Sequence, residues 1–204
     1  MNYFFVAIAA YFLGSISFAV IVSRLFGLPD PRTYGSNNPG ATNVLRSGNK
    51  LAATLTLLGD ALKGWLAVAL VSRAAPMLGL GEVHGALAAL CVFLGHLFPA
   101  FYQFKGGKGV ATALGVLLAL DWRVGCSAAV IWLVMFALTR MSSIAALVTT
   151  LATPIVAFYF RGADLTTGIV LLLALLIIWR HKENILRLLY GRENQVSGSK
   201  STPR

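Results

Sequence analysis

The stretch YFFVAIAAYFLGSISFAVIVSR, residues 3–24, contains no charged residue until Arg24 at its end. A helix needs roughly 20 consecutive apolar residues to cross the hydrocarbon core of a bilayer, and this stretch reaches that length. Met1 and Asn2 supply no basic flank before it, so we expect a first transmembrane span and not a cleaved signal peptide.

The same apolar character continues along the chain. Of its 204 residues, 57% are hydrophobic and 12% are charged, and the mean hydropathy is +0.76. A soluble domain of this length would need more charge to cover its surface. We therefore expect an all-α, polytopic integral membrane protein in which residues 1–204 form a single transmembrane domain. Cys91 and Cys126 lie in apolar stretches and predict no disulfide framework.

The apolar runs predict about seven transmembrane helices, at residues 3–24, 51–73, 84–101, 109–120, 123–139, 143–160 and 165–181. The fourth run is short for a full crossing. It is expected to tilt, to thin the bilayer locally or to start inside a re-entrant loop. The alternative architecture has five spans with re-entrant segments.

The charged residues predict the orientation. Seven spans place the connections 25–50, 102–108 and 140–142 on the same face as the segment after residue 181, and this face carries most of the Lys and Arg. The positive-inside rule makes it cytoplasmic, with the N-terminus outside in the periplasm and the C-terminus in the cytoplasm. Residues 194–204 are expected to form a polar tail. We attribute the net charge of +10 first to this topology and then to anionic substrates, with no nucleic-acid partner.

Three segments are more polar than their surroundings. Residues 35–46 read GSNNPGATNVLR. Their turn-forming residues expose backbone N–H groups, and Arg46 offers a bidentate fork for phosphate. An ordinary turn between spans is the alternative, but its density of Asn, Gly and Ser favours an anion site. The candidate neutral ligands are Ser36, Asn37, Asn38, Thr42 and Asn43.

The second segment, residues 95–112, reads GHLFPAFYQFKGGKGVAT. Gly106, Gly107 and Gly109 allow a close backbone approach, while Lys105 and Lys108 bring two cations to the N-terminus of an apolar helix. A phosphate site is favoured over a pair of topology signals. A Walker motif would need Ser or Thr after Gly-Lys, so we predict no ATP binding.

Two further features involve buried polar groups and the third segment. His96 is a candidate substrate contact, although a hydrogen-bonded interior histidine is commoner. Asp60 and Lys63 share one face of the second span, which favours a structural ion pair. Residues 180–193 read RHKENILRLLYGRE and predict an interfacial helix with His181 and Asn184 on one side, closed by Glu193.

Several common catalytic patterns are absent from the sequence. It contains no Gly-x-Ser-x-Gly elbow, no His-Glu-x-x-His and no metal-ligating Cys/His cluster. None of the three histidines is followed five positions later by Asp, so the His-x4-Asp box of the better-known glycerolipid acyltransferases is missing.

The three polar segments, in this order and over nearly the whole chain, resemble the bacterial acyl-phosphate:glycerol-3-phosphate acyltransferase family. The resemblance implies transfer of a fatty acyl group from acyl phosphate to the 1-hydroxyl of glycerol 3-phosphate, in the first step of phospholipid synthesis. The products are lysophosphatidic acid and phosphate. It further implies no cofactor, no metal, no obligate protein partner and a place in the bacterial cytoplasmic (inner) membrane, with an active site on the cytoplasmic side built from residues 25–50, 102–108 and 180–193.

Roles follow for the individual residues. We assign glycerol 3-phosphate to Ser36, Arg46, Lys105, His181 and Asn184, of which Ser36, Lys105, His181 and Asn184 are the candidate catalytic residues. The acyl-phosphate group is assigned to Lys108, Thr42 and the backbone amides of Gly106, Gly107 and Gly109, and its acyl chain to a groove between spans.

Direct transfer is expected because acyl phosphate carries a good leaving group; the alternative is Ser36 as an acyl-enzyme nucleophile. A permease for a small phosphorylated solute is the alternative function, although no internal repeat is apparent.

Overall fold

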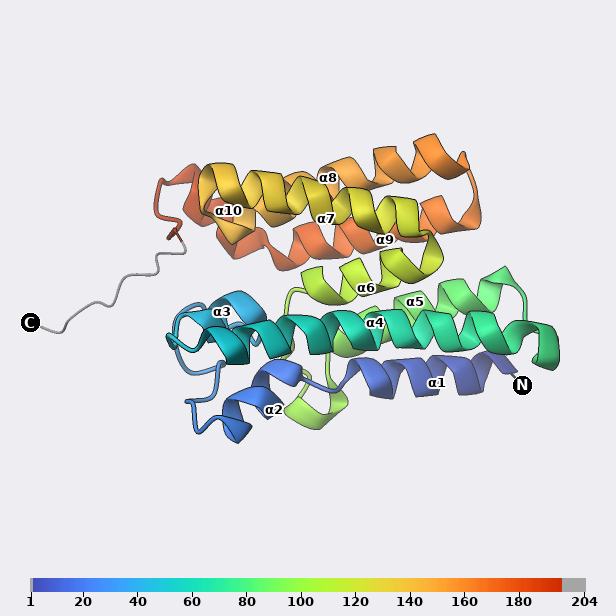
Figure 1. The fold of residues 1–204 in the computed structure, drawn as a ribbon, viewed down its shortest axis with the longest axis horizontal. Helices are drawn as coiled ribbons and strands as arrows, with labels where there is room; N and C mark the ends of the chain where they lie inside the picture. Colours follow the sequence, from blue (N-terminus) through green and yellow to red (C-terminus); the bar gives the residue numbers. More distant parts are fainter. Residues whose placement is uncertain (1, 196–204) are drawn as a thin grey trace, which may run out of the picture.

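The computed structural model describes residues 2–195, and the expected polar tail lies outside the described residues from position 196 onward. Figure 1 shows an elongated bundle of helices that run back and forth along its longest axis. The elements are α1 (Asn2–Gly14), α2 (Phe18–Leu25), α3 (Ala41–Leu45), α4 (Lys50–Leu78), α5 (Glu82–Leu97), the 3-10 turn η1 (Ala100–Tyr102), α6 (Val110–Leu120), α7 (Trp122–Thr139), α8 (Ser142–Arg161), α9 (Leu165–Arg180) and α10 (Lys182–Leu189).

Each apolar run expected to be a span is helical over most of its length, and all the regular elements of the described residues are helices. Five of these segments are long and apolar enough to cross a membrane: Tyr3–Leu25, Lys50–Leu78, Glu82–Tyr102, Trp122–Thr139 and Ser142–Arg161. A sixth appears if α9 and α10, which meet at a bend of 58°, count as one span. Helix α6 has only 11 residues, so the expected count of seven stays a prediction.

The connections gather at two ends of the bundle. In Figure 1, the segment between α2 and α4, the α7–α8 connection and α10 lie at one end, and the α4–α5, α6–α7 and α8–α9 connections lie at the other. Close helix packing holds this arrangement, chiefly α4 on α6, α1 on α5 and α7 on α8. Glycines permit it, because a Cβ at Gly14 would collide with the Val92 carbonyl and one at Gly115 with the Ala61 carbonyl.

A buried ion pair stands where the first span is broken. Residues 15–17 interrupt the helix between α1 and α2, which leaves backbone carbonyls without helical partners in an apolar region. The Lys63 ammonium donates to the Ile16 carbonyl at 2.5 Å and pairs with Asp60 Oδ1 at 2.8 Å. Their side chains are 1% and 3% exposed. The expected Asp60–Lys63 pair is confirmed. Its ammonium also supplies a hydrogen-bond donor to a backbone carbonyl at the break between α1 and α2.

Histidine 96 extends this pair toward the glycine-rich segment. Its Nδ1 atom lies 3.6 Å from Asp60 Oδ1, and its backbone carbonyl accepts a hydrogen bond from Gly107 N–H at 3.2 Å. One buried network therefore connects the α1–α2 break, α4, α5 and the chain before α6.

Removing one partner of this pair is expected to destabilise the protein strongly. Lys63→Met leaves Asp60 as an uncompensated buried charge and Ile16 without its donor, so we expect a loss of about 3–5 kcal/mol in unfolding free energy. The double variant Asp60→Asn/Lys63→Met should lose less than the sum of the two single variants. Unfolding in detergent measures the free energy of unfolding of Lys63→Met, Asp60→Asn and the double variant. Lys50→Met, on the exposed start of α4, is the control. Additive losses would contradict the coupling.

Candidate active site

A cavity of about 690 Å³ opens between the α3–α4 side of the bundle and helices α6 to α9. This volume is within the range of small-molecule sites. Its lining changes character along its length. Polar residues from the α2–α4 segment, the start of α6 and the α9–α10 corner surround one end, and mostly apolar residues of α6, α7 and α9 line the rest. Helix α8 adds a wall that is mostly hydroxyl side chains: Ser142, Ser143, Thr149, Thr150 and Thr153. The shape suits a ligand with a charged head and an apolar tail.

Asparagine 43 organises the polar segment between α2 and α4. It is 1% exposed, and its side-chain amide donates to the Pro31 carbonyl at 2.7 Å and the Tyr34 carbonyl at 3.0 Å. Its Oδ1 accepts from Ser36 N–H at 3.1 Å. Gly35 has a φ of +60° and lies so close to Asn43 that a Cβ would collide with its Oδ1. This fixed loop brings Ser36, Thr42 and Arg46 to the cavity.

The glycine-rich segment is held by Arg180 at the end of α9. Its guanidinium donates from Nη2 to the Gly106 carbonyl at 2.8 Å and from Nε to the Gly107 carbonyl at 3.1 Å. A Cβ at Gly106 would collide with the His96 carbonyl, and one at Gly107 with the His96 ring. These two glycines are needed for packing against α5, and the Gly107 amide is already bonded to His96.

The N-terminus of α6 faces the cavity. Gly109 precedes it with a φ of +85°, a conformation that favours glycine. Ala113 N–H donates to the Gly109 carbonyl at 2.7 Å, so the amides of Val110 and Ala111 precede the first intrahelical bond. Both residues line the cavity. Free amides at the positive end of a helix suit an anion.

Lysine 108 lies beside these amides. Its ammonium donates to Asn184 Oδ1, Asn184 Nδ2 donates to Glu193 Oε1 at 2.6 Å, and Arg187 Nε donates to Glu193 Oε2 at 2.8 Å. Burial, reinforced by the positive charge of Arg187, lowers the pKa of Lys108 to about 8. Although burial raises the pKa of Glu193, the polar and charged neighbours of its carboxylate, Arg187 first among them, together outweigh burial and leave that pKa below its usual value.

Histidine 181 occupies the bend between α9 and α10. It is 3% exposed, and its Nδ1 lies 2.8 Å from the Ile177 carbonyl. Because a carbonyl only accepts hydrogen bonds, this contact places a proton on Nδ1. In the neutral ring Nε2 is then free to accept a proton from a hydroxyl group. His181 lines the cavity, but no hydrogen bond joins its ring to Ser36 within residues 2–195.

The structure therefore gathers most of the residues expected from the sequence around one cavity. Those that line it are Ser36, Asn38, Thr42, Arg46, His96, Lys108, Gly109, His181, Asn184 and Glu193. Four lie outside the lining. Asn37 and Lys105 are exposed, and Gly106 and Gly107 are buried behind the cavity wall. The substrate roles of all fourteen stay predictions.

Sequence reasoning assigned no role to Arg180 or Arg187. Arg187 was only placed on the same side of the predicted interfacial helix as His181 and Asn184. The structure bonds Arg180 to the Gly106 and Gly107 carbonyls, more than 70 residues away in sequence, and Arg187 to Glu193 in the turn that follows α10. The position of Arg180 immediately before His181 is the only signal in the chain that could have marked it.

Comparison with known proteins identifies the family. The profile described as glycerol-3-phosphate acyltransferase matches residues 4–191. Two proteins named glycerol-3-phosphate acyltransferase are similar over 95% of this chain: one from Nitrosospira multiformis, 58% identical over 95% of its own length, and one from Cupriavidus necator, 54% identical over 96%.

A solved structure agrees with these relatives. It is PlsY, an integral membrane glycerol 3-phosphate acyltransferase, in its glycerol 3-phosphate form, which is 37% identical with a TM-score of 0.88 over 96% of each chain. Its lysophosphatidic acid form gives 36% identity and a TM-score of 0.86 over 96% of this chain and 95% of that one. With its multi-pass membrane fold and its cavity of mixed polarity, this chain belongs to the glycerol-3-phosphate acyltransferase family.

Proposed function

We propose that this acyltransferase moves a fatty acyl group from acyl phosphate to the 1-hydroxyl of glycerol 3-phosphate and releases lysophosphatidic acid and phosphate. The observation that carries the proposal is the single cavity with a cationic end and an apolar body. A water-soluble phosphate and a lipid-soluble acyl chain need these two environments side by side. The family assignment replaces the permease alternative.

Two anion sites lie at the polar end. One comprises Lys108 and the free amides at the start of α6, and it suits the phosphate of the acyl donor. The other comprises Ser36 and Arg46 on the Asn43-organised loop, and it suits glycerol 3-phosphate. His181 and Asn184 line the same end, beside Lys108.

The geometry favours direct transfer. The 1-hydroxyl oxygen attacks the carbonyl carbon, the bond to the phosphate oxygen breaks, and the phosphate leaves with its electron pair. The hydroxyl proton passes to His181 Nε2 or to a phosphate oxygen. Charge neutralisation by Lys108 stabilises the leaving group, so positioning and electrostatics supply the catalysis. The acyl-enzyme alternative needs a base on Ser36, and the described residues show no Ser36–His181 hydrogen bond.

The membrane arrangement is proposed with this chemistry. Seven helical passes, with α6 as a short pass, place residues 25–50, 102–108 and 180–193 on the cytoplasmic side of the bacterial inner membrane. The N-terminus is then periplasmic. The excess of Lys and Arg at the α3–α10 end of the bundle supports this orientation.

An assay with purified protein in detergent tests the reaction. Acyl phosphate and glycerol 3-phosphate should yield lysophosphatidic acid and phosphate, and absence of both products would overturn the proposal. In direct transfer Ser36→Ala should lower kcat by about tenfold or less, whereas loss of a covalent nucleophile costs on the order of a million-fold. Ser47→Ala, in the same connection, is the control. An acyl group trapped on Ser36 and found by mass spectrometry would contradict direct transfer.

The lowered pKa of Lys108 predicts a pH dependence. With a pKa of about 8, the ammonium is mostly charged at pH 7 and mostly neutral at pH 9, so affinity for acyl phosphate should fall about tenfold between them. The substrate phosphate does not change charge here, because its second pKa is about 6. Lys108→Arg stays charged and should abolish this alkaline limb. If Lys108→Arg still lost affinity for acyl phosphate between pH 7 and pH 9, another group would be responsible for the pH dependence.

Cysteine labelling in intact bacterial cells tests the orientation. After Cys91 and Cys126 are replaced by alanine, Thr33→Cys in the α2–α4 segment should resist a membrane-impermeant maleimide until the cells are broken. Ala163→Cys, between α8 and α9, should react in intact cells. Both positions are exposed, so access to the reagent depends on the side of the membrane. The reverse pattern would invert the topology.

A further inference from the structure

The part of the cavity remote from the polar end stops at a common level on three helices. Its lining runs from Gly109 to Leu117 on α6, from Ser142 to Thr153 on α8 and from Ile177 to Val170 on α9. At a rise of 1.5 Å per residue these stretches extend roughly 10–17 Å below the polar end. No residue of α6, α8 or α9 beyond that level lines the cavity.

Close packing closes the cavity at this level. Leu117, Ala128 and Val170 belong to one buried cluster with Val124 and Ala157. We call Leu117, Ala128 and Val170 the floor, because they line the cavity on one side and pack into this cluster on the other. Close-packed interiors resist the insertion of even one extra methylene.

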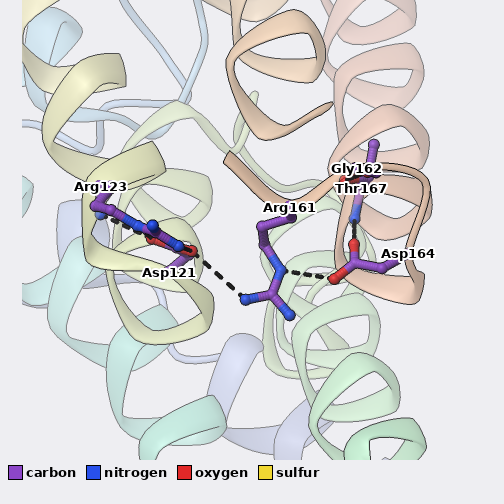
Figure 2. Close-up of polar contacts among 6 residues, drawn as sticks. All are labelled: Asp121, Arg123, Arg161, Gly162, Asp164 and Thr167. Atoms are coloured by element: carbon purple, nitrogen blue, oxygen red, sulfur yellow. Dashed lines mark hydrogen bonds and ion pairs between the residues drawn. The ribbon is translucent and has the colours of Figure 1, made fainter. Parts of the chain in front are cut away.

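An ion network fixes the helices beyond the floor. Figure 2 shows Arg161 between two carboxylates: its Nε lies 2.7 Å from Asp164 Oδ2 and its Nη1 lies 3.5 Å from Asp121 Oδ2. Asp121 also pairs with Arg123 at 2.7 Å. The network therefore ties the α6–α7 connection to the α8–α9 connection, about one helical turn from Leu117 on α6 and from Ala157 on α8.

We propose that the floor measures the acyl chain, so that Leu117, Ala128 and Val170 determine the chain length that the enzyme accepts. This inference rests on the proposed function, because it takes the acyl phosphate to lie with its phosphate at Lys108 and its chain along the cavity. A chain that reaches the floor gains contact with the apolar walls of α6, α7 and α9, and a longer one meets the close-packed cluster behind the floor. The alternative is a chain that leaves sideways between helices and ends in the lipid.

Substitutions at the floor separate these two paths. Ala128→Leu raises the floor and should increase the ratio of kcat/KM for dodecanoyl phosphate over palmitoyl phosphate by about tenfold or more. Leu117→Ala lowers the floor and should move the ratio in the opposite direction, toward palmitoyl and stearoyl phosphate. The matched control is Ala137→Leu, the same change at an exposed position of α7 outside the cavity lining, which should leave the ratio unchanged.

The outcomes are distinguishable from failure of the proposed function. KM for glycerol 3-phosphate should stay constant in all three variants, because the floor is remote from the polar end. If Ala128→Leu does not fold, Leu117→Ala alone tests the inference through its expected shift of the kcat/KM ratio toward the longer acyl phosphates. Floor variants that keep the wild-type ratio would overturn the inference while leaving the reaction intact. Wild-type protein that forms no lysophosphatidic acid from any acyl phosphate would overturn the proposed function itself.

Discussion

The contact between the Lys63 ammonium and the Ile16 carbonyl decides how the site is built. A transmembrane helix normally satisfies its own backbone, and a break at residues 15–17 would be costly without a donor. Lys63 supplies that donor and Asp60 neutralises it, so a charged pair is stable in the interior because each member has a partner. Through His96 the same network reaches Gly107 and positions the chain that enters α6.

This construction explains why the candidate active site is recessed in the bundle. The chain after α5 turns at η1 and α6 starts well inside the length of the bundle, as Figure 1 shows. A short α6 can therefore present its positive end inside the molecule, where few waters compete with an anion. Arg180 completes the support by holding the Gly106 and Gly107 carbonyls from α9. The polar end is thus braced by helices from both halves of the chain.

Much of this could be predicted from the sequence, because hydrophobic length has a direct physical meaning in a membrane. The predicted segments 51–73 and 123–139 lie within α4 and α7. The break within residues 3–24 was missed, because small polar residues do not interrupt an apolar run and the donor for Ile16 lies on another helix. Gly106 and Gly107 were taken as ligand-facing, but the absence of a Cβ serves close packing equally well, and sequence does not separate the two uses. Arg180 was missed because its acceptors are distant carbonyls.

The charge distribution at the polar end of the cavity favours the binding of an anion. Lys108 is half-buried near Arg187, and burial together with the positive charge of Arg187 lowers its pKa, although the negative charge of Glu193 opposes this shift. Asn184 satisfies one of the three ammonium donors with a neutral oxygen, which leaves the others for a phosphate. A dianion at the start of α6 would offset both the desolvation of Lys108 and its repulsion from Arg187. In the proposed reaction the phosphate of the acyl donor would complete this charge stabilisation, and the stabilisation would grow as negative charge develops on the leaving phosphate.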